Sequence, residues 1–581
     1  MRIVTCFVLA TCIASVTAYS FGNTLSNCQN VVKRTSCIGF NRKNSFRTID
    51  GTCNNLRKKT QGAARTVLAR LQPADYVDRQ KIDAPRGFPG TKPTVPTAHQ
   101  VSRAVFQVQR KNQQRARGLS TLFMAFGQFI DHDIGLTPHP KCDVSKGCGS
   151  NSAFAYPCFP IKFTPKGSRC TSFARSVPVC QQGGRRTTRE QINVLSSYLD
   201  LSQVYSNDKT IFRKLRKLDG SGQLKVTRNN LLPIDIPASS PSCENPAGCS
   251  LLGDSRGDEN IALSSMHTIW VRHHNFIAKA LKRRHRSWNE RRLFETARKI
   301  NIGIYQRIVY NEFLPPLVNT GRYRRYNSRV DASIVSVFST AAFRFGHSLV
   351  PNAWALLDKN YNKAFNDISL QASFFDTRPL RRRGIEPIVY GLLKNQSQVV
   401  DTKFAFGIAR RLFVPVGTRG YADLPALNIQ RGRDNGIRTY GTWRKVCKLR
   451  RLRKWSDLIG LMSSSARTAF RKLYKHPNDI DIFAAGIAER HRGGKMLGET
   501  FQCIIKNQFQ RLRNGDRLYF ERAGVFTSRQ RNELRKMTMA KVLCNTLKDV
   551  VSVQIKALKV FGYGNWRREC GSIRGANLNA W

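Results

Sequence analysis

The stretch Gly127-Gln128-Phe129-Ile130-Asp131-His132-Asp133-Ile134-Gly135 places an amide, two carboxylates and an imidazole in one short apolar segment. At 3.6 residues per turn, Gln128 and His132 share one helix face, with Asp131 at its edge, while Asp133 points about 100° away from His132. Flanking phenylalanines predict burial, and a buried charge without a partner is costly. The segment therefore indicates either a core histidine with satisfied partners or a functional site completed elsewhere in the chain.

The first 18 residues are typical of a secretory signal peptide. Arg2 precedes an apolar run from Ile3 to Ala14, and small residues follow up to Ala18. This run is too short to span a bilayer, and no later stretch is long and apolar enough to do so. We expect an exported chain without a transmembrane segment, with an N-terminal extension at 19–36.

Cysteine usage agrees with export. Two of the 16 cysteines, Cys6 and Cys12, leave with the signal, so 14 remain, an even number in an oxidising compartment. Five of the 14 lie in the Gly-, Pro- and Ser-rich passage 136–186, and none has the spacing of a metal-binding CxxC pair. We therefore predict disulfide bonds.

The chain is strongly basic, because 97 Lys and Arg residues against 37 Asp and Glu residues give a formal net charge of +60. The basic clusters are dispersed along the sequence, for example at 282–284, 322–325, 381–383 and 450–454. This distribution predicts a basic surface that binds a polyanion, such as acidic extracellular matrix, a sulfated glycan or an anionic cell surface. The chain contains no nucleic-acid recognition motif such as a zinc finger or RNP sequence.

Apolar residues recur mainly with helical spacing. Leu293, Ala297, Ile300, Ile304 and Ile308 recur every three or four residues, before Pro315-Pro316. The Pro- and Gly-rich passages lack the low complexity of linkers, and no repeat period is present. We predict one large, mainly α-helical domain with little β structure, from about residue 37 to 581.

Three further segments place polar residues in apolar surroundings. In Val335 to Leu349, Arg344 and His347 are one helical turn apart. The other two segments are Asp423 to Asp434, and Gly253 to Asn260 followed by Met266-His267-Thr268. Each one alone is compatible with a structural role in a protein core.

These segments, together with 127–135, resemble the motifs of the animal haem peroxidase family (the peroxidase-cyclooxygenase superfamily) in order and spacing. Additional matches lie at 46–55, 158–161 and 479–482. The resemblance covers nearly the whole mature chain. It implies a mainly α fold in which haem b is buried between a distal and a proximal helix.

By this resemblance, His347 is the proximal haem-iron ligand. Asn428 would accept the hydrogen of its second ring nitrogen, fixing the imidazole tautomer. Arg344 and Arg431 would pair with the haem propionates, a bidentate contact that suits guanidinium.

On the distal side, the resemblance implies that His132 takes a proton from hydrogen peroxide and returns it to the leaving oxygen. Arg256 would stabilise the charge that develops in this step, and Gln128 would hold water or a halide. Asp131 and Glu259 match two carboxylates that are ester-linked to haem in many members of the family. The alternative for both is a buried, hydrogen-bonded acid.

The family also binds calcium beside the distal helix. Asp133 matches its first carboxylate, and the matching loop supplies Ser196, Tyr198, Asp200 and Ser202. Carboxylates, hydroxyls and main-chain carbonyls form a hard oxygen set that suits calcium.

The family's disulfides would carry over as Cys37–Cys53, Cys142–Cys158, Cys148–Cys170, Cys243–Cys249, Cys447–Cys503 and Cys544–Cys570. Cys28 and Cys180 then remain, either paired with each other or available to bridge subunits. Asn395 heads a sequon and is a candidate for surface glycosylation.

The sequence thus predicts a secreted, extracellular haem peroxidase that uses hydrogen peroxide to oxidise halide, thiocyanate or phenolic donors. Asn260 stands where chloride-oxidising members carry a haem-bonded methionine, which points away from chloride. The basic surface adds the hypothesis that the enzyme cross-links tyrosines in acidic extracellular matrix. The alternatives are an inactive structural matrix protein on the same fold and a fatty-acid oxidase of the cyclooxygenase type, which would need a membrane-binding segment.

Overall fold

The computed structural model describes residues 28–32, 36–38, 46–78, 83–88, 94–111, 118–142, 144, 148, 157–165, 167–180, 188–240, 242–562 and 564–581. The predicted signal at 1–18 and most of the extension at 19–36 lie outside these residues. Within the described part, no helix combines the length and the apolar character needed to cross a membrane.

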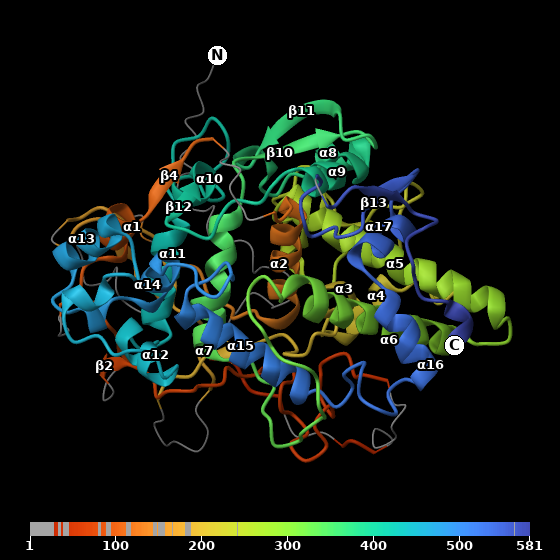
Figure 1. The fold of residues 1–581 in the computed structure, drawn as a ribbon, viewed down its shortest axis with the longest axis horizontal. Helices are drawn as coiled ribbons and strands as arrows, with labels where there is room; N and C mark the ends of the chain where they lie inside the picture. Colours follow the sequence, from red (N-terminus) through yellow and green to blue (C-terminus); the bar gives the residue numbers. More distant parts are fainter. Residues whose placement is uncertain are drawn as a thin grey trace.

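Helices fill the body of the molecule (Figure 1). The α-helices are α1 (Ala98–Val105), α2 (Thr121–Ile134), α3 (Ser202–Tyr205), α4 (Lys209–Leu215), α5 (Ile261–Arg284), α6 (Glu290–Ile308), α7 (Ser336–Thr340), α8 (Arg378–Arg383), α9 (Glu386–Lys394), α10 (Phe406–Ala409), α11 (Leu424–Asp434), α12 (Tyr440–Val446), α13 (Ser464–Leu473), α14 (Ile482–Ala488), α15 (Glu499–Asn514), α16 (Ser528–Lys536) and α17 (Met539–Thr546). The 3-10 helices are η3 (Ser255–Asp258), η5 (Ala342–Leu349), η6 (Gln371–Ser373), η7 (Trp455–Leu458), η8 (Pro477–Asp479) and η9 (Leu578–Ala580), and η4 (Val309–Phe313) is a π-helical turn.

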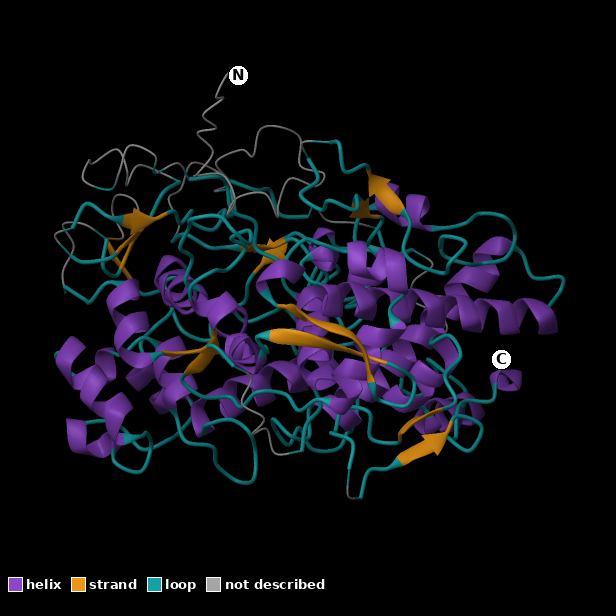
Figure 2. Cartoon of the chain, turned by 90° about the horizontal axis from the view of Figure 1, so that it is seen from above, coloured by secondary structure: helices purple, strands orange, loops and turns teal. Residues whose placement is uncertain are grey.

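Strands are short and, in the part of the chain described, pair only two at a time. The antiparallel pairs are β1 (Thr66–Val67) with β7 (Ile192–Asn193), β2 (Tyr76–Asp78) with β3 (Ala84–Pro85), β5 (Ile161–Lys162) with β6 (Cys170–Thr171), β8 (Ile234–Ile236) with β9 (Cys249–Ser250), β10 (Ala353–Leu357) with β11 (Lys363–Ser369), and β13 (Ser552–Gln554) with β14 (Arg567–Glu569); β4 (Gln107–Gln109) and β12 (Lys403–Ala405) pair in parallel. Figure 2 shows the β10–β11 hairpin as the most extended ribbon among the helices. The prediction of one mainly α-helical domain with little β structure is confirmed.

Helix α2 lies at the centre of the molecule (Figure 1) and packs against α5, α9 and η5. Most of its side chains are buried, including Phe126 and Phe129. Both of these rings stack on Trp270 of α5, and Tyr305 of α6 meets all three edge-on. This aromatic packing fixes α2, and with it the polar side chains that α2 carries.

The segment from Val335 to Leu349, in which we expect Arg344 and His347 one helical turn apart, consists of two helical pieces. Helix α7 ends at Thr340, and Ala341 leaves the helical region at φ −137° and ψ −64°. The following turns are 3-10 helical, with three residues per turn, so residues three apart lie directly above one another. Arg344 and His347 therefore project in the same direction more closely than an α-helix would allow.

The structure joins cysteines as Cys37–Cys53, Cys142–Cys158, Cys148–Cys170, Cys243–Cys249, Cys447–Cys503 and Cys544–Cys570, the six pairs that the resemblance implies. It also joins Cys28 to Cys180, which is the first of the two alternatives for these residues. This seventh bond ties the start of the described chain to the loop that precedes β7.

Candidate active site

A cavity of about 220 Å³ lies between α2 and η5. Gln128, Asp131 and His132 line it from α2, and Arg344 and His347 line it from η5. Much of the remaining wall is apolar and includes Phe123, Phe313, Phe343, Phe374, Leu412 and Phe413. The fold thus brings together, around one cavity, the two histidine segments that lie far apart in the sequence.

A carboxylate holds Arg256 in place beside His132. Asp254 precedes η3 and accepts from the backbone N–H of Arg256 at 2.9 Å. It also accepts two side-chain bonds from Arg256, Nε to Oδ1 at 2.9 Å and Nη2 to Oδ2 at 2.7 Å. Burial alone would raise the pKa of Asp254, but Arg256 outweighs burial and lowers it to about 2. The pair is therefore ionic, and Arg256 has little freedom to turn away.

The guanidinium of Arg256 also reaches the end of α2. It donates to the carbonyl oxygens of His132 at 3.3 Å and Gly135 at 3.2 Å. These carbonyls belong to the last turn of α2 and to its C-terminal cap, which have no partners within the helix. Arg256 is thereby fixed against the turn that carries His132.

The imidazole of His132 is buried. Its Nδ1 lies 4.0 Å from Oδ1 of Asp254, too far for a hydrogen bond, and has no hydrogen-bond partner among the described residues. Burial lowers the pKa of His132 well below its usual range, and the charge of Arg256 lowers it further. His132 is therefore neutral near pH 7 and able to accept a proton.

Gln128 links α2 to the segment that follows η3. Its Nε2 donates to Oε1 of Glu259 at 3.0 Å, and its Oε1 accepts from Nδ2 of Asn260 at 3.2 Å. Burial raises the pKa of Glu259 to about 7 despite the nearby charge of Arg256. Burial raises the pKa of Asp131 as well. Two carboxyl groups with raised pKa values thus face one apolar cavity.

On the opposite wall, Asn428 of α11 connects Arg344 with His347. Its Oδ1 accepts from Nη1 of Arg344 at 2.7 Å, and its Nδ2 lies 2.9 Å from Nδ1 of His347. The resemblance implies the opposite orientation, with the amide oxygen facing His347. The structure differs because Arg344 can only donate, so it draws the amide oxygen toward itself.

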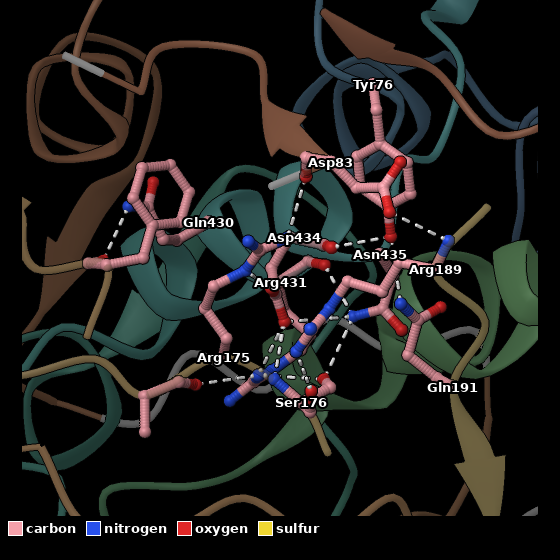
Figure 3. A network of polar contacts seen from close by, with 12 residues as sticks. Tyr76, Asp83, Arg175, Ser176, Arg189, Gln191, Gln430, Arg431, Asp434 and Asn435 are labelled. Atoms are coloured by element: carbon pink, nitrogen blue, oxygen red, sulfur yellow. Dashed lines mark hydrogen bonds and ion pairs between the residues drawn. The ribbon is translucent and has the colours of Figure 1, made fainter. Parts of the chain in front are cut away.

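Arg431 points into a polar network at the end of α11 (Figure 3). Its Nη1 donates to Oδ2 of Asp434 at 3.1 Å, to the hydroxyl of Ser176 at 2.9 Å and to the carbonyl of Ala174 at 3.0 Å. Asp434 also accepts from Arg175 at 2.8 Å. Asp434 thus already neutralises much of the charge of Arg431, whereas Arg344 makes no ion pair with any described residue.

These segments lie within a match to the family model described as animal haem peroxidase, which covers residues 46–558. The chain belongs to the animal haem peroxidase family. Thyroid peroxidase of Sus scrofa is 34% identical, over 96% of this chain and 65% of that protein, so this chain spans just under two thirds of that relative. Myeloperoxidase of Mus musculus is 36% identical, over 92% of this chain and 79% of that protein.

The solved structure of peroxidase A from Dictyostelium discoideum matches with a TM-score of 0.76 and 28% identity, covering 89% of this chain and 99% of that one. A fatty acid alpha-dioxygenase from Oryza sativa matches with a TM-score of 0.69 at 18% identity, over 89% of this chain and 87% of that one. At that identity the second likeness shows the fold alone.

Animal haem peroxidases use haem, and the cavity has the donors that such a group needs. Two imidazoles, His132 and His347, line it from opposite elements, as iron ligation on one side and peroxide binding on the other require. Burial and, to a smaller extent, the charge of Arg431 together lower the pKa of Arg344 to about 10. A buried guanidinium without a carboxylate is a suitable partner for an anionic propionate.

The residues matched to the family's calcium site also lie together. Ser202 donates its backbone N–H to Oδ1 of Asp133 at 2.6 Å, and Ser196 donates its hydroxyl to Oδ2 of Asp200 at 2.8 Å. The remaining oxygens, Oδ2 of Asp133 and Oδ1 of Asp200, are buried and have no hydrogen-bond partner in the described part of the chain. Burial raises the pKa of Asp200 to about 6 and that of Asp133 well above its usual range.

The hydroxyl of Tyr198 donates to the carbonyl of Gln61, so Tyr198 could offer a cation only its main-chain oxygen. No described group of three or more His, Cys, Asp or Glu side chains is placed to hold a metal ion. A cation here would therefore rest on two carboxylates plus hydroxyl and main-chain oxygens. Such a set fits calcium better than it fits zinc.

Asp254 contacts Arg256 directly, although the sequence motifs assign it no role. The segment 253–260 draws attention to Arg256 and Glu259, whereas an aspartate two residues before a helical arginine is typical of an ordinary N-cap. Asp254 is indeed an N-cap, but its side chain also pairs with the guanidinium of Arg256. The signal that could have found it is the Asp-Ser-Arg spacing itself.

The predicted glycosylation residue Asn395 is half-buried at the end of α9. Its main-chain carbonyl accepts from the backbone and the hydroxyl of Thr121. Ser397, the third residue of the sequon, is fully buried. Modification at Asn395 remains a prediction.

Proposed function

We propose that this chain is a secreted haem peroxidase that uses hydrogen peroxide to oxidise iodide, bromide, thiocyanate or phenolic donors. One observation carries the proposal. A neutral, buried His132 lies beside the ion-paired Arg256 and faces His347 across an apolar cavity. This is the arrangement that proton transfer within bound peroxide requires.

When bound, haem supplies an iron that accepts two oxidising equivalents from peroxide. His132 takes a proton from one oxygen of peroxide and gives it to the other oxygen, which leaves. Arg256 stabilises the negative charge that develops as the O–O bond breaks, and Asp254 holds Arg256 in position. Gln128 orients water or a halide beside His132.

On the other wall, His347 would hold the haem iron, and Asn428 would fix the imidazole ring. For ligation through Nε2, the proton of His347 must sit on Nδ1, where the amide oxygen of Asn428 would accept it. That oxygen is now bonded to Arg344. A propionate that pairs with Arg344 would free it, so binding of the cofactor and orientation of its ligand are linked.

We further propose haem b with ester links to Asp131 and Glu259, and calcium at Asp133, Ser196, Tyr198, Asp200 and Ser202. Burial raises the pKa of Glu259 to about 7, so this carboxyl group is partly protonated near neutral pH, and burial raises the pKa of Asp131 as well. The unpartnered oxygens of Asp133 and Asp200 favour a cation between them. Extracellular localisation and attachment to acidic matrix rest on the signal-like N-terminus and the net charge of +60.

The test is an absorption spectrum of the purified, haem-supplied protein before and after peroxide is added. We expect a Soret band that shifts with peroxide and recovers when iodide or a phenol is added. Acidic organic extraction should leave haem on the wild-type chain and release more of it from Glu259→Gln. The absence of a Soret band would instead support a structural matrix protein on the peroxidase fold.

A further inference from the structure

The proposed donors differ greatly in size, and the buried cavity cannot admit the large ones. Its volume is about 220 Å³, and Phe374 and Phe413 meet edge-on with ring centroids 5.0 Å apart in its wall. Haem would fill most of this cavity, so the space left beside it suits a halide or a small phenol but not a tyrosine in a folded protein. Oxidation of protein-borne tyrosines, which rests on the proposed peroxidase function, therefore needs a second site at the surface.

Tyr421 lies next to the wall of the cavity. Phe413 and Leu424 line the cavity, and the bridge between Arg411 and Ala422 fixes the intervening loop. The hydroxyl of Tyr421 donates to Oδ2 of Asp423 at 3.0 Å. In the sequence, only two residues separate Tyr421 from Leu424, which lines the cavity. The carboxylate of Asp423 can accept the hydroxyl proton of Tyr421.

Asp423 connects this tyrosine to the proximal wall. It caps α11 by accepting from the backbone N–H of Ala426 at 2.9 Å. Asn428, which contacts His347, lies five residues further on, about 7 to 8 Å along the helix axis at 1.5 Å per residue. Burial raises the pKa of Asp423 and makes its carboxylate a better proton acceptor than a solvent-exposed aspartate.

The ring of Tyr421 belongs to a partly exposed aromatic cluster with a basic rim. It lies edge-on to Phe163 and His99, at 5.4 and 5.7 Å between ring centroids. Arg410 lies 5.9 Å from the Tyr421 ring and Arg169 lies 5.5 Å from the Phe163 ring. The neighbouring residues 415–420 are exposed. Aromatic faces and guanidinium groups together suit a tyrosine in an acidic polypeptide.

We propose that Tyr421 is a second oxidation site, which transfers oxidising equivalents from the cavity to tyrosine side chains of acidic proteins at the surface. Tyr421 gives one electron to the peroxide-oxidised centre and its hydroxyl proton to Asp423, which leaves a neutral tyrosyl radical. A partner tyrosine then gives a hydrogen atom to Tyr421 and becomes the radical, and Asp423 passes its proton to solvent. Two partner radicals join as dityrosine, so one hydrogen peroxide converts two phenols and yields two waters.

The experiment compares a large and a small donor in the haem-loaded protein. A random copolymer of glutamate and tyrosine serves as the large donor, followed by dityrosine fluorescence, and iodide serves as the small donor. In Tyr421→Phe we expect copolymer cross-linking to fall about tenfold while iodide oxidation stays unchanged, since only the surface route is lost. With peroxide and a spin trap alone, peptide mapping should place the adduct on Tyr421 in the wild type.

Two further variants separate the surface route from general damage. Asp423→Asn keeps a good helix cap but removes the proton acceptor, so the adduct on Tyr421 should decrease. Tyr323→Phe removes a hydroxyl that is buried without a hydrogen-bond partner, and it should behave as the wild type.

Copolymer cross-linking at the wild-type rate in Tyr421→Phe, or an adduct that maps to Tyr323, would overturn this inference while leaving the peroxidase proposal intact. A wild-type protein that binds haem but oxidises neither iodide nor the copolymer would overturn the proposed function, and this inference with it.

Discussion

The ion pair between Asp254 and Arg256 fixes the guanidinium beside His132, so its loss should slow the reaction with peroxide. In Asp254→Asn, an amide offers Arg256 one acceptor where the carboxylate offers two, and the ion pair is lost. We expect the reaction with peroxide to slow by about 10- to 100-fold, as is typical when a supporting hydrogen-bond partner is removed. The KM for the small donor should stay unchanged. Stopped-flow absorbance at several peroxide concentrations measures the peroxide step, and steady-state rates at several donor concentrations measure the KM.

Asp258→Asn is the matched control. Asp258 belongs to the same 3-10 helix and is similarly buried, but it bonds to Ser250, Asn245 and Ser264. Its substitution should leave the peroxide step unchanged. An equal slowing in both variants would mean that η3 has been distorted, and would contradict the specific role of Asp254.

At this scale, residue type and spacing predict which side chains meet, but not how each one is oriented. The resemblance to the family's motifs implies that His132, Arg256 and His347 approach one another. In the structure His132 and His347 line one cavity, and Arg256 donates to the main-chain carbonyl of His132. The resemblance implies the opposite amide orientation of Asn428, because it takes no account of Arg344 as a competing donor. It does not predict the second pairing of Asp254, because an N-cap satisfies the local pattern by itself.

One buried carboxylate, that of Asp481, joins α11 to the start of α14. Asp481, before α14, accepts from Arg86, from Arg433 of α11 and from Tyr474. Burial alone would raise its pKa, but Arg433 and Arg86 outweigh burial and lower it to about 2. A folded pKa below the ordinary value of about 4 stabilises the fold above pH 4, and this stabilisation of about 2 kcal/mol is lost between about pH 4 and pH 2.

Asp481→Asn should therefore unfold more easily at pH 7, by about 3 to 5 kcal/mol, because two buried arginines lose their partner. The difference from wild type should shrink by about 2 kcal/mol as the pH falls from about 5 to 2. Denaturant unfolding at a series of pH values measures this difference in the free energy of unfolding.

The control is Asp219→Asn. The pKa of Asp219 is also about 2, but its carboxylate is exposed, so the substitution should change the free energy of unfolding by about 1 kcal/mol or less. A pH-independent difference for Asp481→Asn would contradict the linkage.

Calcium removal tests the connection between α2 and the loop at 196–202. Asp133 lies on α2 directly after His132, so a cation shared with Asp200 would fix the turn that carries the proposed catalytic imidazole. We expect a chelator to lower the melting temperature and calcium to restore it. At a hundredfold excess of calcium over its Kd, binding should add about 2.7 kcal/mol to the free energy of unfolding. Asp200→Asn should abolish the response. A melting temperature that changes with neither chelator nor calcium would contradict the proposed calcium site.

The elements themselves are predictable where the apolar period is long and unbroken, as in α5 and α6. They are less predictable where tertiary contacts change the pitch. Helix α6 continues into the π-helical turn η4, and the proximal helix breaks at Ala341 and continues as the 3-10 helix η5. In both places helical periodicity indicates the element but not its hydrogen-bonding pattern, which packing decides.

At the scale of the whole molecule, the net charge of +60 comes from basic residues dispersed along the chain, and those exposed in the described part lie in several separate groups. A hollow of about 880 Å³ beside β11 is lined by Lys363, Arg378, Arg382 and Arg383, but Asp367 and Asp376 line it as well. The exposed Arg451 and Arg453 form another basic group, before η7. Attachment to acidic matrix should therefore depend on the summed field of many cations.

We accordingly expect tight binding to heparin that weakens steeply with salt, by about 10³-fold or more between about 50 and 200 mM if six or more cations take part. The paired reversals Arg382→Glu/Arg383→Glu and Arg451→Glu/Arg453→Glu should each reduce affinity to a similar extent, because each removes the same share of the field. Isothermal titration at several salt concentrations measures the affinities. If only the first pair mattered, heparin would bind in the hollow beside β11, and the dispersed charge would serve another purpose. If salt had little effect, an electrostatic attachment to matrix would be ruled out, because screening weakens every exposed charge.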